Sequence, residues 1–334
     1  MANLGIQALT LADYRKRMAP DGSVDFIIEA LENSNPILQD MVWKEGNLPT
    51  GNVTTVRTSL PTPKIRLINQ GVTPSKSTTK QVQDTCIILE DRSSVDIELL
   101  ALQKDKEAFR RSEDAAFVQS FSDVVAQNLF YGDTGADPHT FNGLAVRYNT
   151  TTGNKGDAGY QVISAGTAGT NNTSIYLVGW GTQNTTGIYP KNSVMGLKHR
   201  DLGEQTVEDS NGGKFQAVES LFTWKAGLAV QNIRANAVVR NIDVSKIGTA
   251  ANDKATVQSI IVAKNRIQGI ERGDKKVVMY VSAKVYDMME LFLMDKTNVY
   301  ITRQELMNKP PQLYFAGIPV KKCDAIAEDE GAVS

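Results

Sequence analysis

The feature that most constrains the fold of this chain is a long stretch without a helix breaker. From Ser93 to Tyr131 there is neither proline nor glycine. Ser93 is a suitable N-cap with Asp96 three residues on, and Gly132 ends the stretch. One apolar stripe recurs there at spacings of three and four: Phe109, Ala116, Phe117, Phe121, Val124, Val125 and Leu129. The stretch predicts one long amphipathic helix, which from Lys104 onward would already measure roughly 40 Å.

The segment before this helix, residues 50–85, has the character of an extended hairpin. Thr, Val, Ser and Asn dominate it, and prolines interrupt it at positions 61, 63 and 74. Apolar and polar residues alternate over 53–58 and again over 64–68. These two runs predict two strands whose edges are broken by proline.

Charge is balanced over the whole chain but not along it. The 36 Lys and Arg against 37 Asp and Glu give a net charge of −1, which excludes a dedicated polyanion binder because such a protein needs a basic excess. Residues 50–85 hold five cations and one anion, a net +4, whereas residues 86–131 hold five cations and nine anions, a net −4. The cations of the predicted hairpin are Arg57, Lys64, Arg66, Lys76 and Lys80.

The remaining segments predict a mixed α and β protein. With 41% apolar residues, the chain can bury one large core or two to three medium ones. Residues 1–49 read as an arm with short helices over 11–18 and 24–32, too poor in apolar residues for a core of its own. Strands are predicted at 174–180, at 222–231 and 237–243 around a 232–236 turn, and at 277–281, 299–302, 313–315 and 318–322. Helices are predicted over 254–268 and after Ser282.

A search for reaction chemistry finds no complete motif. His139 and His199 have no zinc-ligand spacing, and Gly212-Gly213-Lys214 lacks the earlier glycine and the following Ser or Thr of a phosphate loop. Cys86 and Cys323 read as buried reduced thiols. A calcium site at Asp133 and Asp137 is a weak alternative, because the twelve-residue ligand pattern is missing. No signal peptide or membrane span is expected, and no cofactor or metal.

A basic hairpin with few apolar residues needs a partner surface, because it cannot offset its own ordering entropy. The simplest partner is another copy of the chain, with the hairpin of one copy over the acidic helical region of the next. Each exposed ion pair would contribute about 0 to 1 kcal/mol, so the arm and the apolar helix stripe are expected to supply most of the affinity. The alternative is that both charge excesses are solvated faces.

Several stretches resemble the major capsid proteins of tailed bacteriophages, which have the HK97-like fold, and in particular those of short-tailed phages such as the Bordetella phage. The resemblance is carried by Ala30 to Leu38 (ALENSNPIL), Trp43 to Arg57 (WKEGNLPTGNVTTVR), Leu60-Pro61, Pro74 to Thr79 (PSKSTT), Val95-Asp96, Phe141 to Leu144 (FNGL) and Gly317 to Val320 (GIPV).

This resemblance implies an α+β fold with an N-arm (1–49), an E-loop hairpin (50–92), a peripheral domain on a spine helix (93–250) and an α/β axial domain (251–334). In the usual order, the axial domain precedes the final long peripheral strands. Here the strand pair at 222–243 comes before the α/β part, so a rearranged connectivity is expected. Lys64, Lys76 and Lys80 are candidates by position for the lysine crosslink that some members form.

The implied function is a structural protein, not an enzyme. Hexamers and pentamers would build an icosahedral shell around double-stranded DNA, in a virion assembled in the host cytoplasm. The expected partners are a separate scaffolding protein, since no long helical extension precedes the arm, a portal, and possibly a decoration protein; no membrane is involved. A protein-cargo nanocompartment of the same fold and an α/β enzyme with a site in 252–326 are the alternatives.

Overall fold

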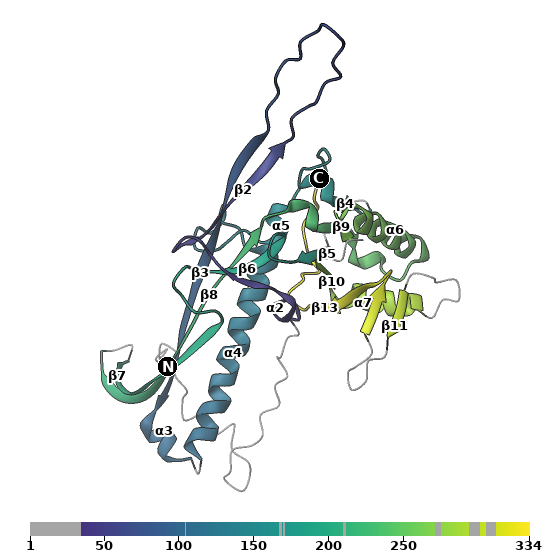
Figure 1. Cartoon of the computed structure of the whole chain (residues 1–334). Coiled ribbons are helices and arrows are strands. Elements are labelled where there is room, and N and C mark those ends of the chain that lie inside the picture. The colour runs from purple at the N-terminus through teal and green to yellow at the C-terminus, as the bar shows by residue number, and fades with distance from the viewer. Residues whose placement is uncertain are drawn as a thin grey trace. The chain divides into compact units, whose positions relative to one another are not determined.

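The computed structural model describes residues 35–103, 105–166, 169, 171–209, 212–270, 275–293, 301–304 and 312–334 (Figure 1). The helices expected over 11–18 and 24–32 lie outside these residues. The described chain divides into two compact units. The first holds residues 88–125 and 194–226, and the second holds the described residues of 34–87, 126–193 and 227–334.

The first unit packs a helix against a twisted β-sheet. Strand β3 (Thr78–Asp96) enters it and is followed by α3 (Ile97–Ala101) and α4 (Lys106–Tyr131). Strands β7 (Leu197–Glu208) and β8 (Lys214–Val230) form a long antiparallel hairpin, and β3 lies beside β8. A register shift between Asp201 and Gly203 bends this hairpin, and Gly203 has a φ of 70°, which favours glycine.

The long helix is shorter than its sequence predicts. Ser93 belongs to β3 and is no N-cap. Asp96 ends the strand and caps α3, where its Oδ1 accepts from the backbone N–H of Glu98 at 2.9 Å. A second cap follows at Asp105, whose Oδ1 accepts from the N–H of Ala108 at 2.9 Å. Two capping aspartates therefore divide a stretch that contains no proline or glycine.

The second unit contains an α/β sheet with the strand order β4-β9-β5-β10-β13-β12-β11. Strand β5 (Asn172–Trp180) is antiparallel to both β9 (Ala237–Asp243) and β10 (Lys276–Val281), and β10 is parallel to β13 (Ile318–Lys322). The outer strands are β4 (Val162–Ser164), β12 (Gln312–Phe315) and β11 (Ile301–Gln304).

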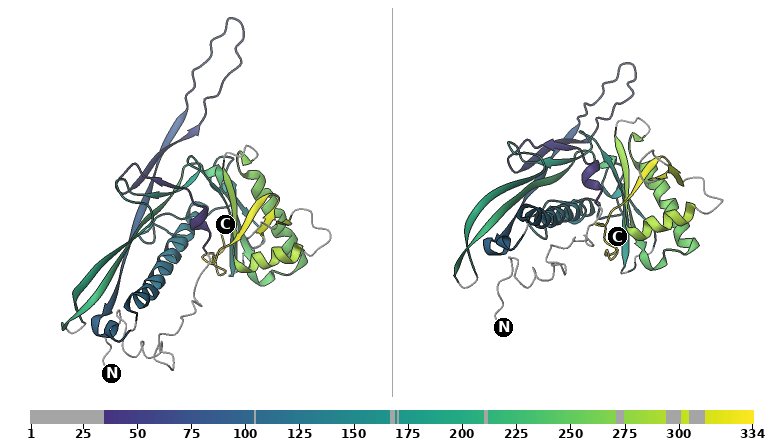
Figure 2. Two further views of the ribbon diagram at one scale, coloured as in Figure 1. Left: turned by 60° about the horizontal axis from the view of Figure 1, so that its bottom comes forward. Right: turned by 90° about the horizontal axis from the view of Figure 1, so that it is seen from below.

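Helices α6 (Ala250–Arg266) and α7 (Ala283–Leu293) cover one face of this sheet (Figure 2). Alternate residues such as Leu177 and Met279 point into that core. The opposite face carries Tyr176 and Tyr280, which pack against Phe130 in the last turn of α4, with ring centroids 4.9 and 6.4 Å apart. The predicted helix at 254–268, the helix after Ser282 and the strands at 277–281, 313–315 and 318–322 are confirmed.

The two strands predicted within 222–243 exist, but the prediction that they pair with each other is wrong. Strands β8 and β9 do not pair with each other, because the 3-10 helix η2 (Ile233–Ala235) separates them and β9 pairs with β4 and β5. Half of the expected pair therefore lies inside the α/β sheet. The long antiparallel pair is β7 with β8, and it precedes α6 and α7 in the chain.

The second unit also holds the hairpin and several short elements. Strand β2 (Gly51–Ser59) pairs with the first part of β3, from Gly51 opposite Thr85 to Ser59 opposite Thr78. The strand predicted at 64–68 is absent, since residues 60–77 form an open connection beyond the strand ends (Figure 1). The remaining elements are α2 (Ile37–Asp40), β1 (Trp43–Glu45), α5 (Leu144–Arg147), η1 (Gly159–Gln161), β6 (Thr185–Tyr189) and η3 (Val244–Lys246).

Candidate assembly surface

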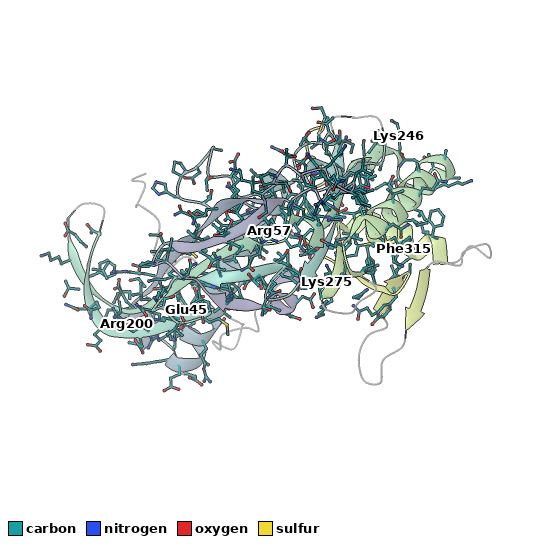
Figure 3. All side chains as sticks on the ribbon, turned by 45° about the horizontal axis from the view of Figure 1, so that its top comes forward. Glu45, Arg57, Arg200, Lys246, Lys275 and Phe315 are labelled. Atoms are coloured by element: carbon teal, nitrogen blue, oxygen red, sulfur yellow. The ribbon has the colours of Figure 1, made fainter. Side chains whose placement is uncertain are left out.

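The five predicted hairpin cations are all exposed. Arg57 lies on β2 (Figure 3), and Lys80 lies on β3 opposite Val56. Lys64, Arg66 and Lys76 belong to the 60–77 connection. Local hydrogen bonds shape that connection: Lys64 Nζ donates to Thr73 Oγ1, and Arg66 Nε donates to the carbonyl of Gln70 at 3.0 Å. Three of the cations thus lie on the loop and two on the strands that lead to it, and all five are exposed.

The same loop exposes a set of large apolar side chains that the sequence pattern did not predict. Ile65 is 97% exposed and Ile68 is 92% exposed. The full set is Leu60, Ile65, Leu67, Ile68 and Val72, and we call it the apolar tip. The alternation in 64–68 predicts a strand, but the structure has no strand there. Several large exposed apolar side chains within one loop are typical of a protein–protein contact.

The single anion of the hairpin is not available to offset these cations. Asp84 is buried at the root of the hairpin, where its Oδ1 lies 2.6 Å from Arg147 Nη2. Burial raises the pKa of Asp84, and the charge of Arg147 opposes that rise. Arg147 also donates to the carbonyls of Asn142 and Leu228, at 2.9 and 3.1 Å. This pair anchors the root, and the exposed part of the hairpin carries only positive charge.

Most of the apolar stripe of α4 packs against other residues of the same chain. Phe109 is buried in a cluster with Val95, Leu99 and Leu100, and the rings of Phe117 and Phe121 lie 5.6 and 6.4 Å from Phe222 on β8. Val125 and Leu129 have no exposed surface. The buried members of this stripe are therefore not available for a contact between copies, whereas Ala116 and Val124 remain exposed.

Acidic charge is concentrated before α4 and not along it. Residues 86–107 hold six anions and three cations, a net −3, while residues 108–131 hold three anions and two cations, a net −1. We call residues 86–107 the acidic segment. It includes β3 beyond Thr85, α3 and the start of α4. Its exposed carboxylates are Glu90, Asp91, Glu98, Asp105 and Glu107, and it also exposes Ile88 and Leu102.

The histidine, aspartates and cysteines that could have taken part in a reaction are engaged in packing or in local hydrogen bonds, or are buried. His199 stacks on Phe222 with ring centroids 4.9 Å apart, and Asp133 and Asp137 accept backbone N–H groups within their own loop. Burial raises the pKa of both Cys86 and Cys323 to about 12, with smaller contributions from neighbouring carboxylates. Within the described part of the chain, no group of three His, Cys, Asp or Glu residues could hold a metal ion.

The described helices were also compared with the length and apolar character of a membrane span. Among the described helices, none combines the length and the apolar character that a membrane span needs.

These observations define a class of protein: an α+β protein with an exposed basic hairpin, a long helix against a sheet and an α/β unit. The family model of the major capsid protein GP7 matches residues 19–334. The chain belongs to this family of phage major capsid proteins.

The chain is also similar to several solved structures. The chain is similar to a capsid structure of bacteriophage Epsilon15, with a TM-score of 0.74 and 30% identity over 100% of this chain and 99% of that one. It is similar in fold to the capsid of bacteriophage JBD30, with a TM-score of 0.50 and 10% identity over 89% of this chain and 93% of that one. The SrpI encapsulin of Synechococcus elongatus PCC 7942 gives a TM-score of 0.43 and 11% identity over 70% and 96%.

Comparison with curated proteins gives no match. The HK97-like α+β fold and the function expected from the sequence, capsid shell formation by many copies of the chain, are confirmed. The protein is a structural component of the virion capsid.

Proposed function

We propose that copies of this chain join into hexamers and pentamers when the hairpin of one copy docks on the acidic segment of the next. The observation that carries this proposal is the apolar tip: five large apolar side chains stand exposed on a basic loop that nothing in the described chain covers. The acidic segment has the matching chemistry, because it exposes both carboxylates and the apolar side chains of Ile88 and Leu102.

The two kinds of side chain contribute differently to this contact. An exposed ion pair contributes about 0 to 1 kcal/mol, and burying a large aliphatic side chain contributes about 1.5 to 3 kcal/mol. The apolar tip therefore supplies most of the affinity, while Arg57, Lys64, Arg66, Lys76 and Lys80 set the register of docking. Fixed register is what a closed shell requires, since a heterologous contact closes into rings only at one rotation.

We further propose that the shell encloses double-stranded DNA and assembles in the host cytoplasm with a scaffolding protein, a portal and possibly a decoration protein. A net charge of −1 supports a wall that touches DNA without gripping it. The stretch from Trp43 to Arg57 supports a source among short-tailed phages of the Bordetella type. Covalent crosslinking through Lys64, Lys76 or Lys80 would appear as ladders of multimers on denaturing gels of mature shells.

The decisive experiment replaces the two most exposed side chains of the apolar tip without changing the charge of the loop. Ile65→Ser with Ile68→Ser should reduce the yield of shells and capsomers at least tenfold, as counted by negative-stain microscopy and sedimentation. Unfolding by urea should not change, because neither side chain packs within its own chain. The control is Leu291→Ser, which removes a large apolar side chain of α7 that is 64% exposed and lies outside the tip. Shells at the wild-type yield from the double variant would refute the docking role of the tip.

A further inference from the structure

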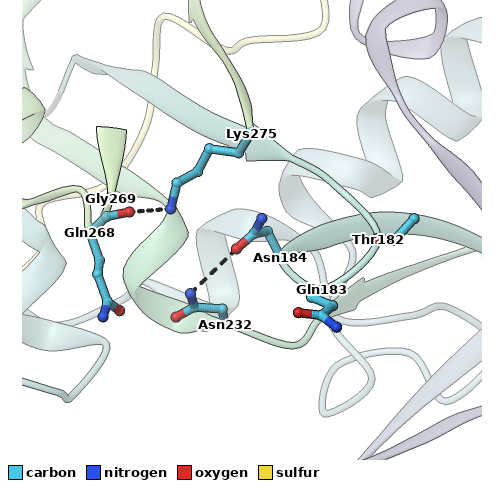
Figure 4. Close-up of a pocket in the computed structure, with 7 residues that line it drawn as sticks. All are labelled: Thr182, Gln183, Asn184, Asn232, Gln268, Gly269 and Lys275. Carbon is cyan, nitrogen blue, oxygen red and sulfur yellow. Dashed lines mark hydrogen bonds between the residues drawn. The ribbon is translucent and has the colours of Figure 1, made fainter. Parts of the chain in front are cut away.

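Two clusters of polar side chains lie outside the core of the second unit. One lines a small pocket of about 260 Å³ between the turn after β5 and the start of β10 (Figure 4). Its contacts are local: Asn232 Nδ2 donates to Asn184 Oδ1 at 3.3 Å, and Lys275 Nζ donates to the carbonyl of Gln268. The charge of Lys275 is thus engaged within its own chain. The other cluster lies in the 60–77 connection and at its two ends.

This connection, the loop of the hairpin, does not continue the main-chain ladder of its strands. Pairing of β2 with β3 ends where Ser59 lies opposite Thr78, just after a register shift that makes Thr58 a β-bulge. Beyond that point prolines occupy positions 61, 63 and 74. Proline has no backbone N–H to donate, so these positions interrupt a ladder of main-chain hydrogen bonds. Any order in the loop must therefore come largely from side chains.

Side-chain hydrogen bonds link the two arms of the loop where the main chain does not. Each of them joins the first arm, residues 58–66, to the second arm, residues 70–78. We call this set the side-chain ladder. Its rungs, from the mouth of the loop to its apex, are the hydroxyl of Thr78 with those of Thr58 and Ser59 (2.8 and 2.7 Å), Ser75 Oγ with the carbonyl of Thr62 (3.3 Å), Lys64 Nζ with Thr73 Oγ1, and Arg66 Nε with the carbonyl of Gln70 (3.0 Å).

The rungs keep the register of the hairpin along both arms. From the first rung to the second, each arm advances by three residues, counted from Ser59 and Thr78, and from the second to the third each arm advances by two. A turn closes the apex, in which the N–H of Gln70 donates to the carbonyl of Leu67 at 3.2 Å and Asn69 has a φ of 64°. The loop is therefore a continuation of the hairpin whose cross-links come from side chains.

The ladder leaves the apolar tip free while it restricts the loop that carries it. All rungs are formed by polar groups, so the large apolar side chains of the tip stay exposed. A loop that is disordered before it docks must lose backbone entropy at the moment of docking. A loop whose arms are already cross-linked has lost part of that entropy beforehand, so more of the burial energy of the tip becomes affinity.

We propose that the side-chain ladder preorganises the loop, and that Thr73, Ser75 and Thr78 are positioning residues for the docking of the apolar tip. The role in docking rests on the proposed function, whereas the rigidity of the loop does not. One measurement on the dispersed chain therefore tests the ladder, and a second measurement on shells tests its use in assembly.

Rigidity is measured by trypsin cleavage of the dispersed full chain, with the bond after Arg66 followed by mass spectrometry. The ladder variant, Thr73→Val with Ser75→Ala and Thr78→Val, removes the hydroxyl groups of three rungs and keeps the charge of the loop. Cleavage after Arg66 should become about fivefold faster, because a loop that opens more often is cut more often. The hydroxyl-preserving variant, Thr73→Ser with Ser75→Thr and Thr78→Ser, should be cut at the wild-type rate.

The matched control removes three hydroxyl groups of the same hairpin that belong to no rung. It is Thr55→Val with Ser77→Ala and Thr79→Val, and all three residues are exposed. Its cleavage rate should equal that of the wild type. In assembly, the ladder variant should need about threefold more protein to form shells, since its loop must be ordered during docking. The control and the hydroxyl-preserving variant should assemble at the wild-type concentration.

The two parts of the proposal fail separately. Equal cleavage after Arg66 in the wild type and the ladder variant would overturn the rigidity of the loop, as would equally fast cleavage of the ladder variant and the control. Faster cleavage of the ladder variant alone, together with an unchanged concentration for assembly, would overturn the positioning role. Shells at the wild-type yield from the Ile65 and Ile68 double variant would refute the docking itself, and the cleavage rates would still decide whether the ladder holds the loop.

Discussion

At the scale of single residues, a buried ion pair holds the last segment of the described chain against the α/β sheet. Arg240 on β9 lies 2.8 Å from Glu330, and both side chains are buried. Ser174 and Tyr131 also donate to Glu330, and Arg240 donates to the carbonyl of Ala145 at 2.9 Å. Two charges removed from water are tolerated here because their hydrogen-bonding capacity is largely satisfied.

Removing only one partner of this ion pair should destabilise the chain more than removing the charges of both partners. Arg240→Met should lower the free energy of unfolding by about 3 to 5 kcal/mol, because it leaves the carboxylate of Glu330 buried and unpaired. Adding Glu330→Gln should restore part of that loss, since the second substitution removes the orphaned charge. Urea unfolding of the dispersed chain measures both values. Equal losses in the single and double variants would show that the packing of Arg240, and not its charge, stabilises this contact.

A second carboxylate, Asp40, joins the end of α2 to the sheet. Its oxygens lie 2.6 Å from Lys276 Nζ and 2.8 Å from Lys321 Nζ, and Tyr280 donates to it at 3.0 Å. Burial alone would raise the pKa of Asp40, but the hydrogen bonds from Lys276 and Lys321 outweigh it, and the pKa falls below its usual value. The stabilisation is therefore present above the unfolded pKa of about 4 and is lost as the pH falls through the folded value.

Asp40→Asn should accordingly destabilise the chain by roughly 1 to 3 kcal/mol at pH 7. The difference from the wild type should shrink as the pH falls below about 4, where the wild-type carboxyl takes up a proton. Unfolding curves at pH 7, 5 and 3 measure this trend. Tyr280→Phe is the control, because it leaves both ion pairs of Asp40 and removes two hydrogen bonds of the Tyr280 hydroxyl, one to Asp40 and one from Trp180. A difference that does not depend on pH would contradict the role of the charge.

At the scale of elements, the boundary between α3 and α4 shows how a side chain can end a helix. The stretch from Ser93 to Tyr131 has high enough helix propensity to predict a continuous helix, yet Asp96 and Asp105 bind backbone N–H groups of the residues that follow them. Aspartate competes with the helix in this way because its short side chain reaches the backbone two or three residues on. Periodicity predicted the apolar side of α4 but not where α4 begins.

The contribution of the Asp105 cap to the free energy of unfolding can be measured. Asp105→Ala should lower the free energy of unfolding by about 1 kcal/mol, because the first turn of α4 loses an acceptor for the N–H of Ala108. Asp105→Asn should cost much less, since asparagine is an equally good N-cap. Glu98→Ala on α3 controls for the loss of one exposed negative charge. Equal losses for the alanine and asparagine variants of Asp105 would indicate that charge, and not capping, is involved.

At the scale of the whole molecule, the basic charge of the hairpin and the negative charge of the acidic segment lead to a prediction about assembly. Reversal of Arg57, Lys64 and Arg66 to Glu should abolish shells or make their yield depend on salt, while each subunit stays folded because all three side chains are exposed. Reversal of Glu90, Asp91 and Glu98 to Lys in the same chain should restore assembly, since the attraction between copies is then rebuilt with opposite signs. Particle counts by microscopy at about 0.1 M and 1 M salt measure both effects. A doubly reversed chain that fails to assemble would show that the acidic segment is not the docking surface.

Features that depend on neighbours in the sequence could be read from the sequence alone. Alternation and helical periodicity located α6, β10, α7 and β13, and the motifs around Trp43 to Arg57 carried the resemblance to phage capsid proteins. The tertiary structure alone decided which surfaces remain exposed. It placed the α4 stripe against Phe222, gave β9 to β5, paired Asp84 with Arg147 and left Ile65 and Ile68 uncovered. The reason is physical: propensity and periodicity arise from residues close in the chain, whereas burial and strand pairing depend on residues far apart in it.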